Sequence, residues 1–220
     1  MLCYNQFNKK EAGFLYVTQF STTYCSKFDR IGGDAVAKGT RVNPMTIRSK
    51  SALSQALLKL MMSKPFDEIA ISDITDRAGL SRQTFYTNFN KKEDILNYLL
   101  NGLFDKYQAR LMAEKTITSS FIVDYFLFWD DNKEFLALLF SQKLGYLFQE
   151  KNRAFFMDSI ENMDELFMVE VWQLPYIKAS LAGLTYELLW MWIVNDQGLS
   201  VNILTALASN ILGGRIFDGT

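Results

Sequence analysis

Residues 71–92 read ISDITDRAGLSRQTFYTNFNKK, and this pattern predicts two short helices joined by a tight turn. In the first helix Ile71, Ile74 and Ala78 recur at spacings of three and four, which places them on one apolar face. Ser72 is suited to cap this helix, because its hydroxyl can accept a hydrogen bond from a free backbone N–H. Gly79 then ends it, since glycine adopts the left-handed backbone conformation without a steric penalty. The pattern is the first half of a helix-turn-helix.

The second helix of this stretch is predicted to begin after Ser81, which is suited to cap it. Phe85 and Phe89 lie four residues apart and turn inward together. The remaining side chains face outward, form hydrogen bonds and include no acid: Arg82, Gln83, Thr84, Tyr86, Thr87 and Asn88. A helix of this kind can enter the major groove of DNA with its first residues on the bases. The stretch therefore predicts a module that binds double-stranded DNA.

The outward side chains suit different parts of the DNA. Arg82 can fork onto guanine and Gln83 can pair with adenine, so we expect both, with Tyr86 beside them, to contact bases. Phosphate contacts are expected from Thr84, Thr87, Asn88 and Lys92, and from the hydroxyl and free backbone amides at Ser72. The alternative is a pair of packed helices with a solvated polar face. Such a face normally mixes Glu with Lys, whereas residues 80–92 contain no acid.

Residues 78–96, AGLSRQTFYTNFNKKEDIL, resemble the helix-turn-helix signature of the TetR family of bacterial transcription regulators. The resemblance extends from Thr46 to Leu100 and continues more weakly to about Leu212. Thr75 stands where the family usually has Ala, and Asn88 stands where His is commonest. The resemblance implies the same division of DNA contacts. It also implies a C-terminal domain in which a ligand or partner changes the spacing of two DNA modules.

The composition favours a helical protein with a sizeable core, because 49% of the 220 residues are hydrophobic and only three are prolines. Residues 45–115 hold eleven basic and eight acidic side chains, whereas residues 116–220 hold six and thirteen. This asymmetry suits local phosphate binding without general adhesion to nucleic acid. We predict an all-α protein, with an N-terminal three-helix helix-turn-helix DNA-binding domain and a C-terminal helical domain for ligand binding and dimerisation.

Several classes of function are disfavoured by what the sequence lacks. There is no histidine, which excludes histidine acid–base chemistry and histidine-ligated metal sites. Cys3 and Cys25 form no metal or redox motif, and the chain has no phosphate-binding glycine loop. The N-terminus does not read as a signal peptide, and the longest apolar window, Ser180 to Val194, is too short to cross a bilayer. We expect a cytoplasmic bacterial regulator with no enzymatic activity, cofactor, metal or membrane contact.

The helix signals divide the chain into four parts. Residues 1–44 form an unassigned extension, for which the hypotheses are a true translation start at Met45 or a basic arm that touches DNA. Residues 45–92 form the DNA-binding domain, 93–115 a connecting helix begun by an Asn90–Glu93 capping box, and 116–213 a regulatory and dimerisation domain. Outside the central stretch, helices are expected at Thr46–Ser63, Lys91 to about Glu114, Ser120–Trp129, Lys133–Ser141, Leu144 to about Asp164, Pro175–Asn195 and Ser200–Leu212.

The last two of these helices carry apolar stripes. The stripes consist of Ile177, Leu181, Leu184, Leu188 and Met191, and of Val201, Leu204, Leu207, Ala208 and Ile211. In the family that the sequence resembles, this helix pair forms a four-helix bundle with its mate in a homodimer. Alternatively, both stripes close the core of a monomer. A dimer has independent support, because two recognition helices one helical turn apart read a palindromic operator.

Aromatic side chains of the C-terminal domain are candidates to line an apolar ligand pocket, although aromatics at helical spacing also form ordinary core: Phe121, Tyr125, Trp129, Phe156, Tyr186 and Trp190. The acidic balance of this domain favours a small apolar or cationic effector. We therefore expect a TetR-like repressor that such an effector releases from its operator. The alternative is a TetR-like regulator or activator that a protein partner controls.

Overall fold

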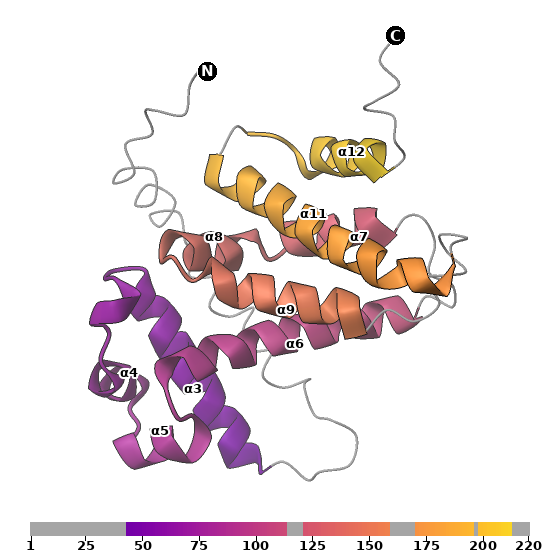
Figure 1. Cartoon of the computed structure of the whole chain (residues 1–220). Helices are drawn as coiled ribbons and strands as arrows, with labels where there is room; N and C mark the ends of the chain where they lie inside the picture. Colours follow the sequence, from indigo (N-terminus) through magenta and orange to yellow (C-terminus); the bar gives the residue numbers. More distant parts are fainter. Residues whose placement is uncertain (1–42, 114–120, 159–169, 196–197, 213–220) are drawn as a thin grey trace.

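The computed structural model describes residues 43–113, 121–158, 170–195 and 198–212, and all regular structure in these ranges is helical (Figure 1). The all-α prediction is confirmed. The elements are α3 (Pro44–Met61), the 3-10 turn η2 (Phe66–Glu68), α4 (Ile71–Ala78), α5 (Arg82–Asn88), α6 (Lys92–Ala113), α7 (Phe121–Asp130), α8 (Lys133–Ser141), α9 (Gly145–Asp158), the 3-10 turn η3 (Val171–Gln173), α11 (Leu174–Asn195) and α12 (Val201–Leu212). Residues 1–42, to which the start-site and basic-arm hypotheses refer, and the predicted boundary at residue 116 lie outside the described residues.

Helix α3 begins at Pro44 because the preceding residue caps it. The Asn43 side chain accepts a hydrogen bond from the Met45 N–H (3.0 Å). Proline suits the first helical position, where the N–H that it lacks would have no partner within the helix. Leu53 and Leu57 are fully buried and give α3 its core-facing side. The helix starts and ends two residues earlier than the sequence pattern predicts.

Helix α4 begins before the residue that was predicted to cap it. Ala70 occupies the N-cap position, and its N–H donates to the Asp73 carboxylate (2.9 Å). Ser72 therefore lies inside the first turn, and the prediction that it caps α4 is wrong. The physical reason is that Asp73 already binds the free N–H at the start of the helix. At the other end Gly79 has a φ of 65°, which confirms the predicted left-handed termination.

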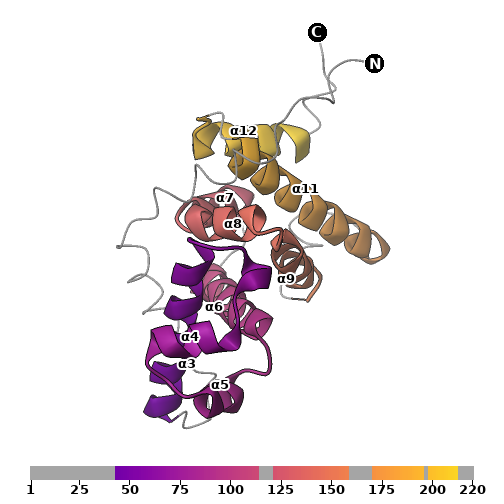
Figure 2. The same ribbon diagram turned by 90° about the vertical axis from the view of Figure 1, so that its left-hand side faces the viewer.

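Helix α5 has the cap and the inward side that the sequence predicts. The Ser81 hydroxyl accepts a hydrogen bond from the Thr84 N–H (3.1 Å). Phe85 and Phe89 are buried, and their ring centroids lie 6.1 Å apart. Helix α5 packs against α3 and α4, and Figures 1 and 2 both show these three helices at one end of the molecule. They form the three-helix unit that presents the predicted DNA-binding residues.

Helix α6 connects this unit to the rest of the protein. Its start is fixed by Asp94, whose carboxylate accepts from the N–H groups of Asn90 (2.9 Å) and Lys91 (3.1 Å). The predicted capping box with Glu93 is therefore wrong, because Asp94 takes the N–H that Glu93 was expected to bind. Along its length α6 packs against α3, α7 and α9. One continuous helix is thus embedded in both halves of the molecule.

The second half of the molecule is built around a cluster of aromatic rings. Phe104 of α6 lies 5.2 Å from Trp129, 5.9 Å from Phe148 and 5.5 Å from Phe155, measured between ring centroids. Helix α11 packs along α9 and α8, and α12 packs against α7. In Figure 2, α12 lies at the end opposite to α5. No helix in the described ranges combines the length and the apolar character that crossing a membrane requires.

Candidate DNA-binding face

The outer side of α5 carries the side chains predicted to contact bases. Arg82 and Gln83 in its first turn are exposed, and Tyr86 is 52% exposed. The Tyr86 ring packs edge to face against buried Phe85, with centroids 5.5 Å apart and an interplanar angle of 83°. This contact directs the phenol away from the core. The three side chains lie on one accessible side of a short helix, where they can reach the edges of base pairs.

The side chains of α5 that were predicted to contact phosphates already form hydrogen bonds within or next to the helix. The Thr87 hydroxyl donates to the Gln83 carbonyl (2.9 Å), and the Asn88 Nδ2 donates to the Thr84 carbonyl (2.7 Å). The Thr84 and Ser81 hydroxyls lie 2.9 Å apart. The Asn88 Oδ1 is buried and has no hydrogen-bond partner in the described part of the chain, and an oxygen acceptor is the wrong group for a phosphate. Phosphate contacts from these residues would therefore require their side chains to turn.

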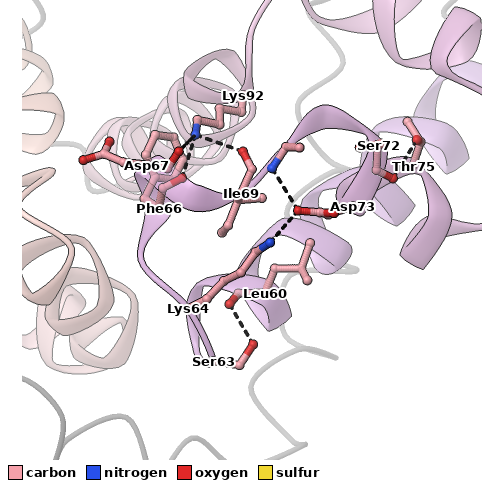
Figure 3. A network of polar contacts seen from close by, with 11 residues as sticks. Leu60, Ser63, Lys64, Phe66, Asp67, Ile69, Ser72, Asp73, Thr75 and Lys92 are labelled. Carbon is pink, nitrogen blue, oxygen red and sulfur yellow. Dashed lines mark hydrogen bonds and ion pairs between the residues drawn. The ribbon is translucent and has the colours of Figure 1, made fainter.

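Lys92 has a different environment from the one that the sequence suggested. Its ammonium donates to the carbonyls of Phe66 (2.6 Å), Asp67 (3.2 Å) and Ile69 (3.0 Å), as Figure 3 shows. It also lies 4.5 Å from the centroid of the Phe66 ring. A lysine ammonium has three donors, and here three carbonyls accept them. In this arrangement Lys92 fixes the turn that leads into α4.

Ser72, the other residue predicted to contact phosphate, is half-buried in the first turn of α4. Its carbonyl accepts a hydrogen bond from the Thr75 hydroxyl (3.0 Å; Figure 3). Beside it, Asp73 pairs with the Lys64 ammonium. The hydrogen bond from Lys64, together with that from the Ala70 N–H, holds the pKa of Asp73 below its ordinary value. Asp73 is therefore ionised, and its carboxylate stabilises the start of α4 through its contacts with Lys64 and the Ala70 N–H.

The predicted site omitted two cations on the three-helix unit. Arg48 lies in the second turn of α3 and Lys91 directly precedes α6, and both are exposed. Figures 1 and 2 agree that the start of α3 and helix α5 lie side by side at the end of the molecule. Lys50 is less available, since its ammonium lies over the rings of Phe89 (5.6 Å) and Tyr98 (5.0 Å). The sequence signal for Arg48 was its position near the predicted start of a helix, whereas only the structure shows that this start lies beside α5.

The residues predicted to line a ligand pocket fall into three environments. Phe121, Tyr125, Trp129 and Phe156 are all buried, and Tyr125 lies 5.5 Å from Phe156 and 6.1 Å from Trp129. Half-buried Tyr186 belongs to a neighbouring group of rings, and its ring centroid lies 6.3 Å from that of Phe140 and 6.2 Å from that of Phe148. Trp190 is 36% exposed on the outer side of α11. The structure thus separates Trp190 from the other five.

A buried polar group lies among these rings and was not predicted. The Tyr125 hydroxyl donates to Asn152 Oδ1, and Asn152 Nδ2 donates to the Ala182 carbonyl (2.8 Å) and the Thr185 hydroxyl (3.0 Å). Burial raises the pKa of Tyr125 well above its ordinary value, so the phenol is neutral. The Trp129 indole N–H partly opposes this rise but makes no hydrogen bond of good geometry within the described residues. No set of acidic or cysteine side chains in those residues is arranged to hold a metal ion.

In this protein one long helix joins a helix-turn-helix unit, whose second helix carries no acid, to a second helical domain. This is the architecture of the helix-turn-helix class of regulators. The family model described as "Bacterial regulatory proteins, tetR family" matches residues 53–99, which run from α3 into α6. Residues 53–99 are therefore a helix-turn-helix domain of the type found in the TetR family of transcription regulators.

Curated relatives are similar over the same part of the chain. An uncharacterized HTH-type regulator of Bacillus subtilis, YvdT, is 29% identical over 94 residues, 40% of this chain and 48% of its own length. The Escherichia coli HTH-type transcriptional repressor ComR is 27% identical over 93 residues, 40% and 44% of the two chains. The Lactococcus lactis dhaKLM operon activator DhaS is 32% identical over 59 residues, 27% and 32%. The chain therefore spans less than half the length of each of these relatives.

Proposed function

We propose that the protein is a sequence-specific DNA-binding regulator that binds a palindromic operator as a homodimer. The observation that carries the proposal is the exposed side of α5, where Arg82, Gln83 and Tyr86 project together and residues 80–92 contain no acid. In the proposed complex these three side chains contact bases. Arg48 and Lys91, both exposed, supply phosphate contacts, and Thr84, Thr87 and Asn88 do so where their side chains turn outward. Lys92 and Ser72 support the fold of the unit.

The proposed dimer uses faces of α11 and α12 that the protomer leaves uncovered. On α11, Tyr176 is 71% exposed, Met191 48% and Val194 41%. On α12, Ile203 is 54% exposed and Leu207 42%. Most of the predicted apolar stripes instead pack within the protomer, since Leu181, Leu204 and Ala208 are buried and Ile177, Leu184, Leu188, Val201 and Ile211 are partly buried. Apolar side chains on both sides of the same helices support a core on one side and a second protomer on the other.

We further propose that a small apolar or cationic effector releases the protein from its operator, which makes it a repressor. The rings around Tyr125 and Trp129 support an apolar binding region. The Trp129 N–H has no hydrogen-bond partner among the described residues, which supports a ligand that carries a hydrogen-bond acceptor. ComR is named a repressor and DhaS an activator, so a reporter gene behind the selected operator is needed to assign the sign. Increased expression on deletion of the protein supports repression.

Control by a protein partner is the second candidate, and one surface favours it. Val171 and Trp172 of η3 and Tyr176 of α11 are 72%, 64% and 71% exposed. The Trp172 and Tyr176 rings lie 6.5 Å apart, and the Trp172 indole is oriented by a hydrogen bond to Glu170 (2.7 Å). Large aromatic side chains at an exposed site are typical of protein interfaces. In that case DNA binding would respond to the partner and not to small molecules.

Selection of binding sites from random duplex DNA tests the main proposal. The purified protein should enrich a palindrome, and Arg82→Ala should lose base preference at one position of each half-site. Lys59→Ala is the matched control, because Lys59 is an exposed lysine in the last turn of α3, and the opposite, N-terminal end of α3 is the one beside α5. It should select the same sequence as the unaltered protein. Failure to enrich any sequence would overturn the proposed function.

A further inference from the structure

One side chain of the second domain pairs with the backbone of the DNA-binding unit. Gln142, the residue after α8, donates from Nε2 to the Met61 carbonyl (2.7 Å) and accepts from the Phe66 N–H at Oε1 (2.8 Å). Met61 ends α3 and Phe66 begins η2, so a single amide bridges the two ends of the turn between them. The last carbonyls of a helix have no partner within it, and Gln142 supplies one. The two bonds have opposite polarity and fix the orientation of the amide as well as its position.

The same segment is held a second time by the connecting helix. The Lys92 ammonium binds the carbonyls of Phe66 and Ile69, on the C-terminal side of the Gln142 contact (Figure 3). The next residue, Ala70, gives its N–H to Asp73 in the first turn of α4. A continuous series of polar contacts therefore runs from the end of α8 to the start of the helix-turn-helix.

The position of Gln142 depends on how the second domain packs. Lys143, the next residue, has a φ of 60°, a left-handed conformation that costs free energy in residues other than glycine. At Gly145 an added Cβ would lie 2.8 Å from Phe140 Cδ1 and 3.3 Å from the Tyr186 hydroxyl. The turn between α8 and α9 is thus closely packed against side chains of α8 and α11. A displacement of Tyr186 or of this turn would move the Gln142 amide.

We propose that Gln142 is a positioning residue through which the packing of the second domain sets the orientation of the helix-turn-helix unit. This inference rests on the proposed function, because orientation matters only if the unit binds DNA. The physical link itself is a property of the folded protein and is testable without DNA. A planar amide that binds one carbonyl and one N–H transmits both translation and rotation of the α8–α9 turn to residues 61–70.

A double-mutant cycle followed by hydrogen exchange tests this link in the full chain. Gly145→Ala displaces the α8–α9 turn, and Gln142→Glu keeps the acceptor for the Phe66 N–H but removes the donor to the Met61 carbonyl. Each variant alone should speed amide exchange in residues 62–70 by about tenfold, because the turn loses hydrogen bonds to α8. The double variant should exchange no faster than either single one. Gln149→Glu, the same change at an exposed position of α9, should have no effect on residues 62–70.

Two results would overturn the inference. In the first, Gly145→Ala alters exchange around residues 138–150 but leaves residues 62–70 unchanged. In the second, the effects of the two substitutions multiply, which would show that they act independently. If Gly145→Ala does not fold, Tyr186→Leu disturbs the same turn from α11 and takes its place in the cycle.

A DNA arm separates failure of this link from failure of the proposed function. With a selected operator, DNA binding to the unaltered protein should slow exchange at residues 138–145, and Gln142→Glu should bind DNA without this slowing. Slowing of the same size in both proteins contradicts the role of Gln142. If the unaltered protein selects no operator, the proposed function fails, and the cycle without DNA still decides whether Gln142 couples the two domains.

Discussion

Replacing Lys92 by methionine should destabilise the protein without changing how DNA binding depends on salt. The substitution keeps an unbranched side chain of similar length but removes the ammonium that binds three carbonyls and lies 4.5 Å from the Phe66 ring centroid. A hydrogen bond from a charged group contributes about 1.5–3 kcal/mol and an exposed cation–π contact about 0.5–1 kcal/mol. Since one half-buried ammonium makes all of these contacts, we expect a total loss of about 3 kcal/mol. For a chain of this size, that lowers Tm by about 6–12 °C.

The assay compares thermal unfolding and operator binding at several salt concentrations. Lys91→Met is the matched control, because Lys91 is the neighbouring lysine, is exposed, and makes no side-chain hydrogen bond or ion pair within the described residues. It should keep the Tm and reduce the slope of log K against log salt by about one, as expected for one lost phosphate contact. A Lys92→Met protein that kept the Tm and reduced that slope would contradict the structural role of Lys92. Lys92 would then be the phosphate ligand that the sequence suggested.

Three other predictions concern different parts of the chain. Arg82→Ala should cost about 1–3 kcal/mol of binding free energy per half-site and relax preference at one base pair, measured by competition between operator variants; a uniform loss on all sequences would contradict base contact. The pKa of Asp73 is lowered in the folded protein, so its stabilisation is present above the unfolded pKa near 3.8 and is lost as pH falls through the lower folded pKa. Asp73→Asn should therefore flatten the fall of Tm with acid, and an unchanged acid profile would exclude this role. Among the described residues no atom of another element lies within 4 Å of a Cβ built at Gly183, so Gly183→Leu should keep the fold but shift sedimentation toward monomer; an undisturbed dimer would place the interface elsewhere.

The sequence predicts most of the helix-turn-helix because its signals are local. Ser81 caps α5 and Gly79 ends α4 through contacts with residues within four positions along the chain. The cap of α4 was missed because two neighbouring side chains can serve it. Asp73 is favoured over Ser72 by a partner, Lys64, that only the folded turn brings close. Local chemistry offers the alternatives, and tertiary contacts select between them.

Long-range contacts explain what the sequence did not predict. The role of Lys92 follows from carbonyls 23 to 26 residues away that converge on one point, a geometry that no spacing in the sequence reveals. Helix α11 is apolar on several sides, so its periodicity does not tell which side faces the core. The predicted stripe packs largely inside, whereas Met191 and Trp190 lie outside. The Gln142 contacts, 76 and 81 residues from their partners, are of the same kind.

The polar group at Asn152 has a consequence for how the second domain aligns its helices. Rings and aliphatic side chains pack against one another in many ways, and an aromatic core alone tolerates a helix that slides along its neighbour. Asn152 of α9 satisfies its amide through Ala182 and Thr185 of α11 and through Tyr125 of α7. Sliding α9 by one turn, about 5.4 Å, would bury all of these groups without partners. One asparagine thus selects a single register among three helices.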